Sequence, residues 1–162
     1  MEDGSALISK EKVVINEMVE EIADELEIMS EEERLTLHTC FEEQVVIEGN
    51  LSLIASIFRN LTENAIAYSG GKTIFISLIE NNEHECRIRF EDDGRGVEQE
   101  QLSRLFERFY RVDKGRSRQM GGTGLGLSIV KHAVQFHGGS ISVTNRPGGG
   151  LRFDFSLKKG GV

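Results

Sequence analysis

The hydrophobic positions of the first fifty residues follow the period of a strand in some stretches and of a helix in others. Residues 12–15 form a short β-branched run, and Asn16 is the predicted cap of the helix after it. Residues 35–41 alternate apolar and polar side chains, and together with the run at 44–48 they predict two short strands. The apolar residues of the predicted helix recur at the 3.6-residue period, at Met18, Val19, Ile22, Leu26 and Met29.

A longer helix and a pair of strands are predicted in the middle of the chain. Asn50 is the predicted cap of a helix that runs to about Tyr68, where the Ser-Gly-Gly sequence at 69–71 stops it. Residues 72–80 and 84–92 then alternate apolar and polar side chains, which predicts a central hairpin. We expect its second strand to bury Cys86, Ile88 and Phe90.

The last part of the chain combines regular segments with a long irregular one. A short helical piece is expected at residues 98–106, whereas residues 114–122 are polar and irregular. An irregular segment of this length in a compact domain is typically a lid or a binding loop. The helical period returns at 123–136, and residues 140–144 and 150–157 predict a second hairpin. This mixture of elements predicts an α/β (α+β) fold.

Composition limits the classes of function. A length of 162 residues predicts one domain. With 19 Lys and Arg against 27 Asp and Glu, the net charge of −8 argues against nucleic-acid binding, which needs a basic surface. No apolar run approaches the roughly 18 residues of a membrane span, and residues 1–10 lack the plan of a signal peptide, so we expect a cytoplasmic location. Two cysteines do not make a disulfide framework.

The first candidate cluster lies on the long predicted helix. Asn60 and Asn64 are four residues apart, so they share one face, where their amide oxygens could hold a divalent cation. Leu61 and Ala65 would face the core. The alternative is that both Asn are merely exposed polar residues, although Asn is a weak helix former.

The second cluster, residues 92–97, follows the second strand of the predicted hairpin. Its glycines would let the backbone turn sharply and approach a flat ligand, and an ionised Asp92 can accept a hydrogen bond from an exocyclic amine such as that of adenine. An ordinary Asp-Gly turn is the alternative.

The third cluster is the glycine-rich run at residues 121–128, directly before the last predicted helix. Exposed N–H groups and the positive end of the helix dipole would receive phosphate there. The run is neither a Rossmann fingerprint nor a P-loop, and a purely structural glycine hinge is the alternative.

The three clusters, in this order along the chain, resemble the catalytic ATP-binding domain of bacterial sensor histidine kinases. The resemblance covers residues 12–158 and includes the Leu-Phe-Glu-Arg-Phe-Tyr-Arg segment at 105–111. It implies a two-layer sandwich of the Bergerat type, with a mixed sheet packed on one face by about three helices. A flexible ATP lid would lie at about 110–122. Residues 1–11 would be the tail of a preceding dimerisation hairpin or linker, and residues 12–162 the catalytic domain.

The resemblance also implies roles for individual residues. ATP would lie between the long helix and the glycine loop, with Asn64 ligating Mg2+ and Asn60 contacting phosphate or a metal-bound water. Asp92 would read the adenine amine, and Tyr68 would lie near the base. The other implied nucleotide contacts are Gly94, Gly96, Val97, Tyr110, Arg111, Gly122, Thr123, Gly124, Leu125, Gly126 and Leu127. The implied catalytic residues are Arg111, which would reach the γ-phosphate, with Asn60 and, as a second candidate in the lid, Arg116.

Three positions differ from related sequences in informative ways. Many relatives carry Lys where this chain has Ala67, so one phosphate-directed charge is missing. Asp93 stands where Asn is common and would add a negative charge near the base. Asn60 stands where ATP-hydrolysing relatives have a Glu as general base, and an amide cannot accept that proton. The resemblance therefore favours transfer to a histidine, and Glu63 does not substitute because it lies on another face.

The phosphoacceptor histidine is not among the four His of the chain, which are expected to be structural or surface residues. We therefore expect a fragment that binds ATP and Mg2+. The resemblance implies that this fragment is a monomer, since the family dimerises through the preceding helical hairpin. The fragment would phosphorylate the histidine-bearing dimerisation domain of the same kinase, which feeds a response regulator, in the cytoplasmic part of a membrane-anchored sensor. No direct membrane contact is expected. The alternatives are a nucleotide-binding module that has lost transfer activity and, disfavoured by Asn60, a free-standing hydrolase.

Overall fold

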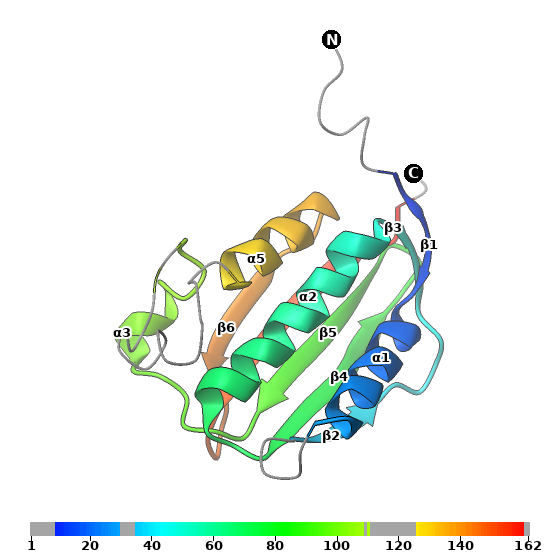
Figure 1. The fold of residues 1–162 in the computed structure, drawn as a ribbon. Coiled ribbons are helices and arrows are strands. Elements are labelled where there is room, and N and C mark those ends of the chain that lie inside the picture. The colour runs from blue at the N-terminus through cyan, green and yellow to red at the C-terminus, as the bar shows by residue number, and fades with distance from the viewer. Residues whose placement is uncertain (1–8, 30–34, 109, 111–125, 161–162) are drawn as a thin grey trace.

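Five strands form one mixed sheet, and helices cover one of its faces (Figure 1). The structure, a computed structural model, describes residues 9–29, 35–108, 110 and 126–160. The strands are β1 (Glu11–Val14), β2 (Thr36–Cys40), β3 (Val46–Gly49), β4 (Thr73–Asn81), β5 (Glu85–Asp92), β6 (Ile141–Asn145) and β7 (Leu151–Lys158). The helices are α1 (Ile15–Glu27), α2 (Leu51–Asn64) with a π-helical turn η2 (Ala65–Ser69), α3 (Gln99–Leu102) and α5 (Gly126–Phe136).

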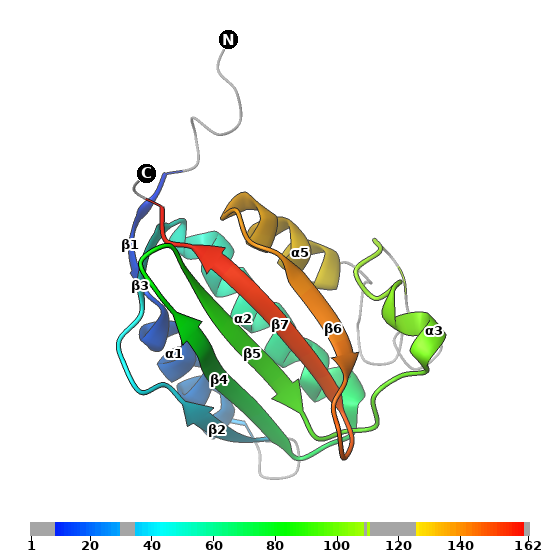
Figure 2. The same ribbon diagram turned by 180° about the vertical axis from the view of Figure 1, so that it is seen from behind.

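The main sheet has the strand order β2-β4-β5-β7-β6. Among the described strands of this sheet, β2 and β4 pair in parallel and the other neighbours are antiparallel. The predicted hairpin of β4 and β5 therefore lies inside the sheet, and the second predicted hairpin is β6 with β7. A separate antiparallel pair joins β1 to β3. Figure 2 shows the opposite face of the sheet, which the helices leave uncovered.

The predicted caps of the two long helices have different outcomes. Asn50 is the N-cap of α2, and its side chain accepts a hydrogen bond from the backbone N–H of Leu53, as predicted. The prediction for Asn16 is wrong, because α1 begins at Ile15 and its N-cap is Val14, two residues before the predicted cap. Asn16 instead uses its amide outside the helix, since its Oδ1 accepts from the N–H of Val45 at 2.8 Å.

The core lies between the helices and the sheet. Cys86, Ile88 and Phe90 are at most 1% exposed, as the alternation of β5 predicted. Phe58 of α2 packs edge-on against Phe155 of β7, with their ring centroids 5.9 Å apart. Burial of this apolar layer fixes which face of α2 points inward, and therefore which face is left for other chemistry.

Candidate functional site

Helix α2 presents Asn60 and Asn64 on its partly exposed side, while Leu61 and Ala65 are buried, 1% and 2% exposed. The Asn60 amide nitrogen donates to the carbonyl of Ser56 at 2.8 Å, which fixes the orientation of the side chain. Its Oδ1 lies next to Gly126, 3.2 Å from the position that a Cβ of that residue would occupy. The predicted polar helix face and the end of the predicted glycine loop thus lie side by side.

The end of α2 joins the segment that follows β5. Tyr68 belongs to the π-helical turn η2, which Gly70 ends in the left-handed conformation with φ of 71°. The carbonyl of Ser69 accepts a hydrogen bond from the N–H of Arg95 at 2.9 Å. Gly94 packs so closely on Ser69 that a Cβ would overlap its carbonyl. This contact explains the first glycine of the 92–97 segment and places that segment against the helix.

Asp92, the last residue of β5, is 3% exposed. Its Oδ1 accepts hydrogen bonds from the N–H of Gly94 at 2.9 Å and of Leu151 at 3.3 Å. Burial raises the pKa of this carboxyl, and the two backbone donors partly oppose the rise. The hairpin-turn alternative for the Asp93-Gly94 pair is excluded, because β5 pairs with β4 and β7 while the chain after Asp92 leads to α3. Both backbone donors occupy the same oxygen, so the carboxyl is held in place while its other oxygen keeps its capacity to accept.

Asp93 has a different environment from its neighbour. Its Oδ1 accepts from the N–H groups of Lys72 and Thr73, at 2.8 and 2.9 Å. Burial would raise the pKa of this carboxyl, but the hydrogen bonds from Thr73 and Lys72 outweigh burial and lower it. Asp93 therefore anchors the start of β4, a role that its sequence position did not reveal.

The Gly96–Val97 backbone is held by Asn145, at the end of β6. Asn145 Oδ1 accepts from the N–H of Val97 at 3.0 Å, and its Nδ2 donates to the Val97 carbonyl at 2.7 Å. Gly96 has a φ of 70°, in the left-handed region that favours glycine. Sequence reasoning missed Asn145, and its only signal is an Asn immediately after an alternating strand.

The remaining predicted residues divide into those that the structure describes and those that it does not. Tyr110 is partly buried against the core, and the guanidinium of Arg104 lies 4.5 Å from its ring centroid. Leu127 also packs partly buried against the core from the first turn of α5. The predicted residues outside the described part of the chain are Arg111, Arg116, Gly122, Thr123, Gly124 and Leu125.

The chemistry of the polar α2 face fits a hard cation. Amide oxygens with phosphate oxygens and waters are suitable ligands for Mg2+. Among the described residues, no group of three or more His, Cys, Asp or Glu side chains could hold a metal ion by itself. A cation here would therefore depend on an oxygen-rich ligand in addition to Asn64.

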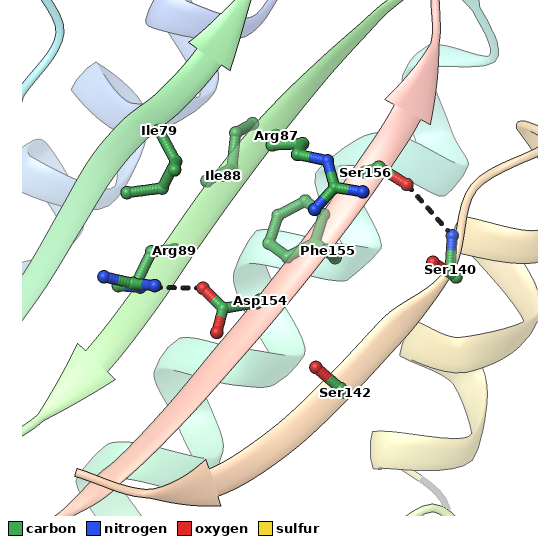
Figure 3. Close-up of a pocket in the computed structure, with 9 residues that line it drawn as sticks. All are labelled: Ile79, Arg87, Ile88, Arg89, Ser140, Ser142, Asp154, Phe155 and Ser156. Atoms are coloured by element: carbon green, nitrogen blue, oxygen red, sulfur yellow. Dashed lines mark hydrogen bonds and ion pairs between the residues drawn. The ribbon is translucent and has the colours of Figure 1, made fainter.

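A hollow of about 260 Å3 lies on the uncovered face of the sheet (Figure 3). Arg89 and Asp154 in its floor form an ion pair at 2.7 Å, and the hydroxyl of Ser156 accepts from the N–H of Ser140. None of the predicted site residues lines it. The sheet thus separates this hollow from Asn60 and Asn64. Both of its arginines already have ion-pair partners, since Arg89 pairs with Asp154 and Arg87 with Glu85.

Across residues 9–29, 35–108 and 126–160, the structure contains no helix whose length and apolarity would allow it to cross a bilayer.

Comparisons with known proteins point to one family. The family model described as "Histidine kinase-, DNA gyrase B-, and HSP90-like ATPase" matches residues 49–161. Sensor-like histidine kinase SenX3 of Mycolicibacterium smegmatis is 34% identical over 158 residues, which cover 97% of this chain and 41% of that protein. Sensor histidine kinase WalK of Bacillus subtilis is 33% identical over 151 residues, which cover 92% of this chain and 25% of that protein. The chain therefore spans less than half the length of these relatives.

Solved structures share the fold. The catalytic domain of histidine kinase ThkA superposes with a TM-score of 0.79 at 24% identity, over 94% of this chain and 97% of that one. Full-length ShkA, solved in complex with AMPPNP, superposes with a TM-score of 0.77 at 22% identity, over 93% of this chain and 31% of that one. The two-layer arrangement predicted from the sequence is thereby confirmed.

Proposed function

Because this chain belongs to the family of histidine kinase-, DNA gyrase B- and HSP90-like ATPases, as a catalytic ATP-binding domain of the sensor histidine kinase type, we propose that it binds ATP with Mg2+. It then transfers the γ-phosphoryl group to a histidine on a separate helical dimerisation domain. Nothing in the comparisons favours a module that has lost transfer. The observation that carries the proposal is the buried, doubly hydrogen-bonded carboxyl of Asp92.

Asp92 gives the site its selectivity for the base. A buried carboxylate with one oxygen engaged by backbone donors accepts the exocyclic amine of adenine with the other oxygen. Gly94, Gly96 and Val97 offer backbone beside it, and Tyr68 contributes an aromatic ring from η2. An amine donor is favoured over a carbonyl acceptor, because two acceptors facing each other repel.

The phosphates extend toward the start of α5. Asn64 would ligate Mg2+, and Asn60, next to Gly126, would contact a phosphate or a metal-bound water. When bound, Mg2+ supplies charge neutralisation on the phosphate oxygens. The N–H groups of the glycine-rich run at 122–127 would receive the same oxygens. Ala67 adds no cation here, so Arg111 and Arg116 would supply the remaining positive charge.

The transfer step needs little proton chemistry from this domain. A neutral imidazole nitrogen of the acceptor histidine attacks the γ-phosphorus in line, the bond to the bridging oxygen breaks, and ADP leaves. Arg111 would stabilise the charge on the transferring group with its planar fork, and Arg116 is the second candidate. Asn60 orients and does not abstract a proton, because an amide is not a base at neutral pH.

The proposal extends to the parts of the kinase around this domain. We assign residues 1–11 to the tail of a preceding dimerisation hairpin or linker, residues 12–162 to the catalytic domain and about 110–122 to the ATP lid. The partners are the histidine-bearing dimerisation domain and, downstream, a response regulator. The domain would act as a monomer in the cytoplasm, without touching nucleic acid or the membrane itself.

The first test is calorimetric titration of a slowly hydrolysed ATP analogue with Mg2+ into wild-type protein and Asp92→Ala. Binding by the wild type, lost in the variant and with an analogue lacking the adenine amine, supports the site. A histidine-bearing hairpin supplied in trans should then gain acid-labile phosphate, and Arg111→Ala should abolish most of that transfer while binding persists. Absence of nucleotide binding by folded wild-type protein would overturn the proposal.

A further inference from the structure

We infer that Asn145 is a positioning residue for base recognition: its side chain clamps the Gly96–Val97 backbone and holds it in register with Asp92. The inference rests on the proposed function, because it concerns how that same site tells one base from another. It extends the site to β6, the strand at the edge of the sheet opposite β2 (Figure 2).

The clamp uses both halves of one carboxamide. Asn145 Oδ1 accepts from the N–H of Val97 at 3.0 Å, and Nδ2 donates to the carbonyl of the same residue at 2.7 Å. A side chain that pairs with the donor and the acceptor of one residue imitates a neighbouring strand. It fixes both the position and the rotation of that peptide segment.

The neighbouring glycine permits this approach. A Cβ on Gly96 would lie 2.5 Å from Asn145 Oδ1 and 3.1 Å from the carbonyl oxygen of Gly150. The positive φ of Gly96 adds a second reason why only glycine fits. The two requirements together show that the loop is packed tightly against the β6–β7 hairpin, defined here as residues 145–151.

The same hairpin also holds the base-reading acid. The N–H of Leu151 donates to Asp92 Oδ1, and Gly150 packs so closely on the Asp92 carbonyl that a Cβ would overlap it. One end of the hairpin therefore fixes the carboxyl, and the other end fixes Val97. The distance between the two groups that would meet the base is set by the β6–β7 hairpin and not by the 92–97 segment alone.

A matched residue separates positioning from general stabilisation. Asn82 lies at the opposite end of β5, and its Oδ1 accepts from the N–H groups of His84 and Glu85 at 2.8 and 3.0 Å. It is thus an exposed Asn that holds a backbone segment with two hydrogen bonds, remote from Asp92. Loss of Asn82 should cost similar stability without touching the site.

The experiment compares ADP with inosine diphosphate, which lacks the exocyclic amine, by calorimetry on wild type, Asn145→Ala, Asn145→Asp and Asn82→Ala. We expect wild type to prefer ADP, and Asn145→Ala to bind ADP about fivefold to tenfold more weakly, the effect of losing one or two hydrogen bonds. The ratio of the two affinities should also fall, because the loop no longer keeps its place relative to Asp92. Asn82→Ala should match the wild type in both values.

Asn145→Asp identifies which half of the carboxamide matters. Asp keeps an acceptor for the Val97 N–H but places a second oxygen against the Val97 carbonyl, so it should resemble Asn145→Ala. Equal affinity and selectivity in wild type and Asn145→Ala, or an equal loss in Asn82→Ala, would overturn the inference while the proposed function stands. Failure of the folded wild type to bind ADP would instead overturn the proposed function.

Discussion

The imidazole of His137 joins helices α2 and α5: its Nε2 accepts from the backbone N–H of Asn50 at 3.0 Å, and its Nδ1 lies 2.8 Å from the carbonyl of Ala133. Asn50 begins α2 and Ala133 lies near the end of α5, so the contact ties opposite ends of antiparallel helices. Nδ1 must carry the proton, because Nε2 accepts and a carbonyl cannot donate. His137 is 4% exposed, which confirms the structural role expected from the sequence.

This histidine should make stability depend on pH. Burial lowers the pKa of His137 below its ordinary 6.5; the hydrogen bond to Ala133 opposes that shift, and Lys10 adds to it. Below pH 6.5 the imidazole is therefore protonated in the unfolded chain but still neutral in the folded chain. The free energy of unfolding falls as the pH drops from 6.5 toward the lowered pKa. Urea unfolding between pH 7.5 and 5.5 should show this slope in wild type but not in His137→Gln. The exposed His132 of α5 provides the control, since His132→Gln should keep the slope.

Asp92→Asn should separate the fold from binding. The amide oxygen can still accept from Gly94 and Leu151, and the cost of burying an ionised group disappears. Because the folded pKa of Asp92 is raised, wild type loses stability as the pH rises through the window above 3.8, and the variant avoids this loss. At pH 7 we expect equal or higher stability by urea unfolding, with adenine-nucleotide binding reduced at least about a hundredfold, since an NH2 group would face the amine. Tight binding by Asp92→Asn would contradict the assigned role.

Asp93 should matter for stability more than for the nucleotide. Asp93→Ala leaves the N–H groups of Lys72 and Thr73 without their acceptor, which should cost about 1–3 kcal/mol. Asp93→Asn keeps an acceptor oxygen and should cost clearly less. We expect both variants to bind nucleotide within about threefold of wild type, because the Asp93 oxygen is directed at backbone. A large gain in affinity for Asp93→Asn would instead support the sequence-based idea that this charge weakens binding.

Two glycines of the β6–β7 hairpin form a matched pair. Gly148 and Gly150 have φ of 91° and 104°, so alanine is strained at both. A Cβ at 148 meets open space, whereas a Cβ at 150 overlaps the Asp92 carbonyl. Gly148→Ala should cost about 1–2 kcal/mol and leave nucleotide affinity unchanged. Gly150→Ala should be destabilised about twice as much and lose affinity, measured by unfolding and by calorimetry. Equal losses of stability at both positions would show that backbone strain alone, and not the contact with Asp92, determines the effect of alanine.

The sequence predicted the layers better than it predicted the details that hold the site together. Alternation in β5 identified Cys86, Ile88 and Phe90 as core residues, because period-two burial depends only on local pattern. The pairing of Asn145 with Val97 spans 48 residues, and no local pattern encodes such a contact. The prediction of Asn16 as a helix cap failed for the same reason, because its side chain bonds the backbone of Val45, 29 residues away, and not the start of its own helix.

The π-helical turn at Ala65–Ser69 changes the angular phase of the residues that follow Asn64. In an uninterrupted α-helix, Asn60, Asn64 and Tyr68 would fall on one line, four residues apart. A π-helical turn contains more residues, so each residue advances less around the helix axis. Tyr68 is therefore displaced from the line of the two asparagines. Removing one residue from the turn would restore the α-helical phase and bring a different side chain to the position of Tyr68. The length of this one turn is therefore as much a part of the site as the identity of its residues.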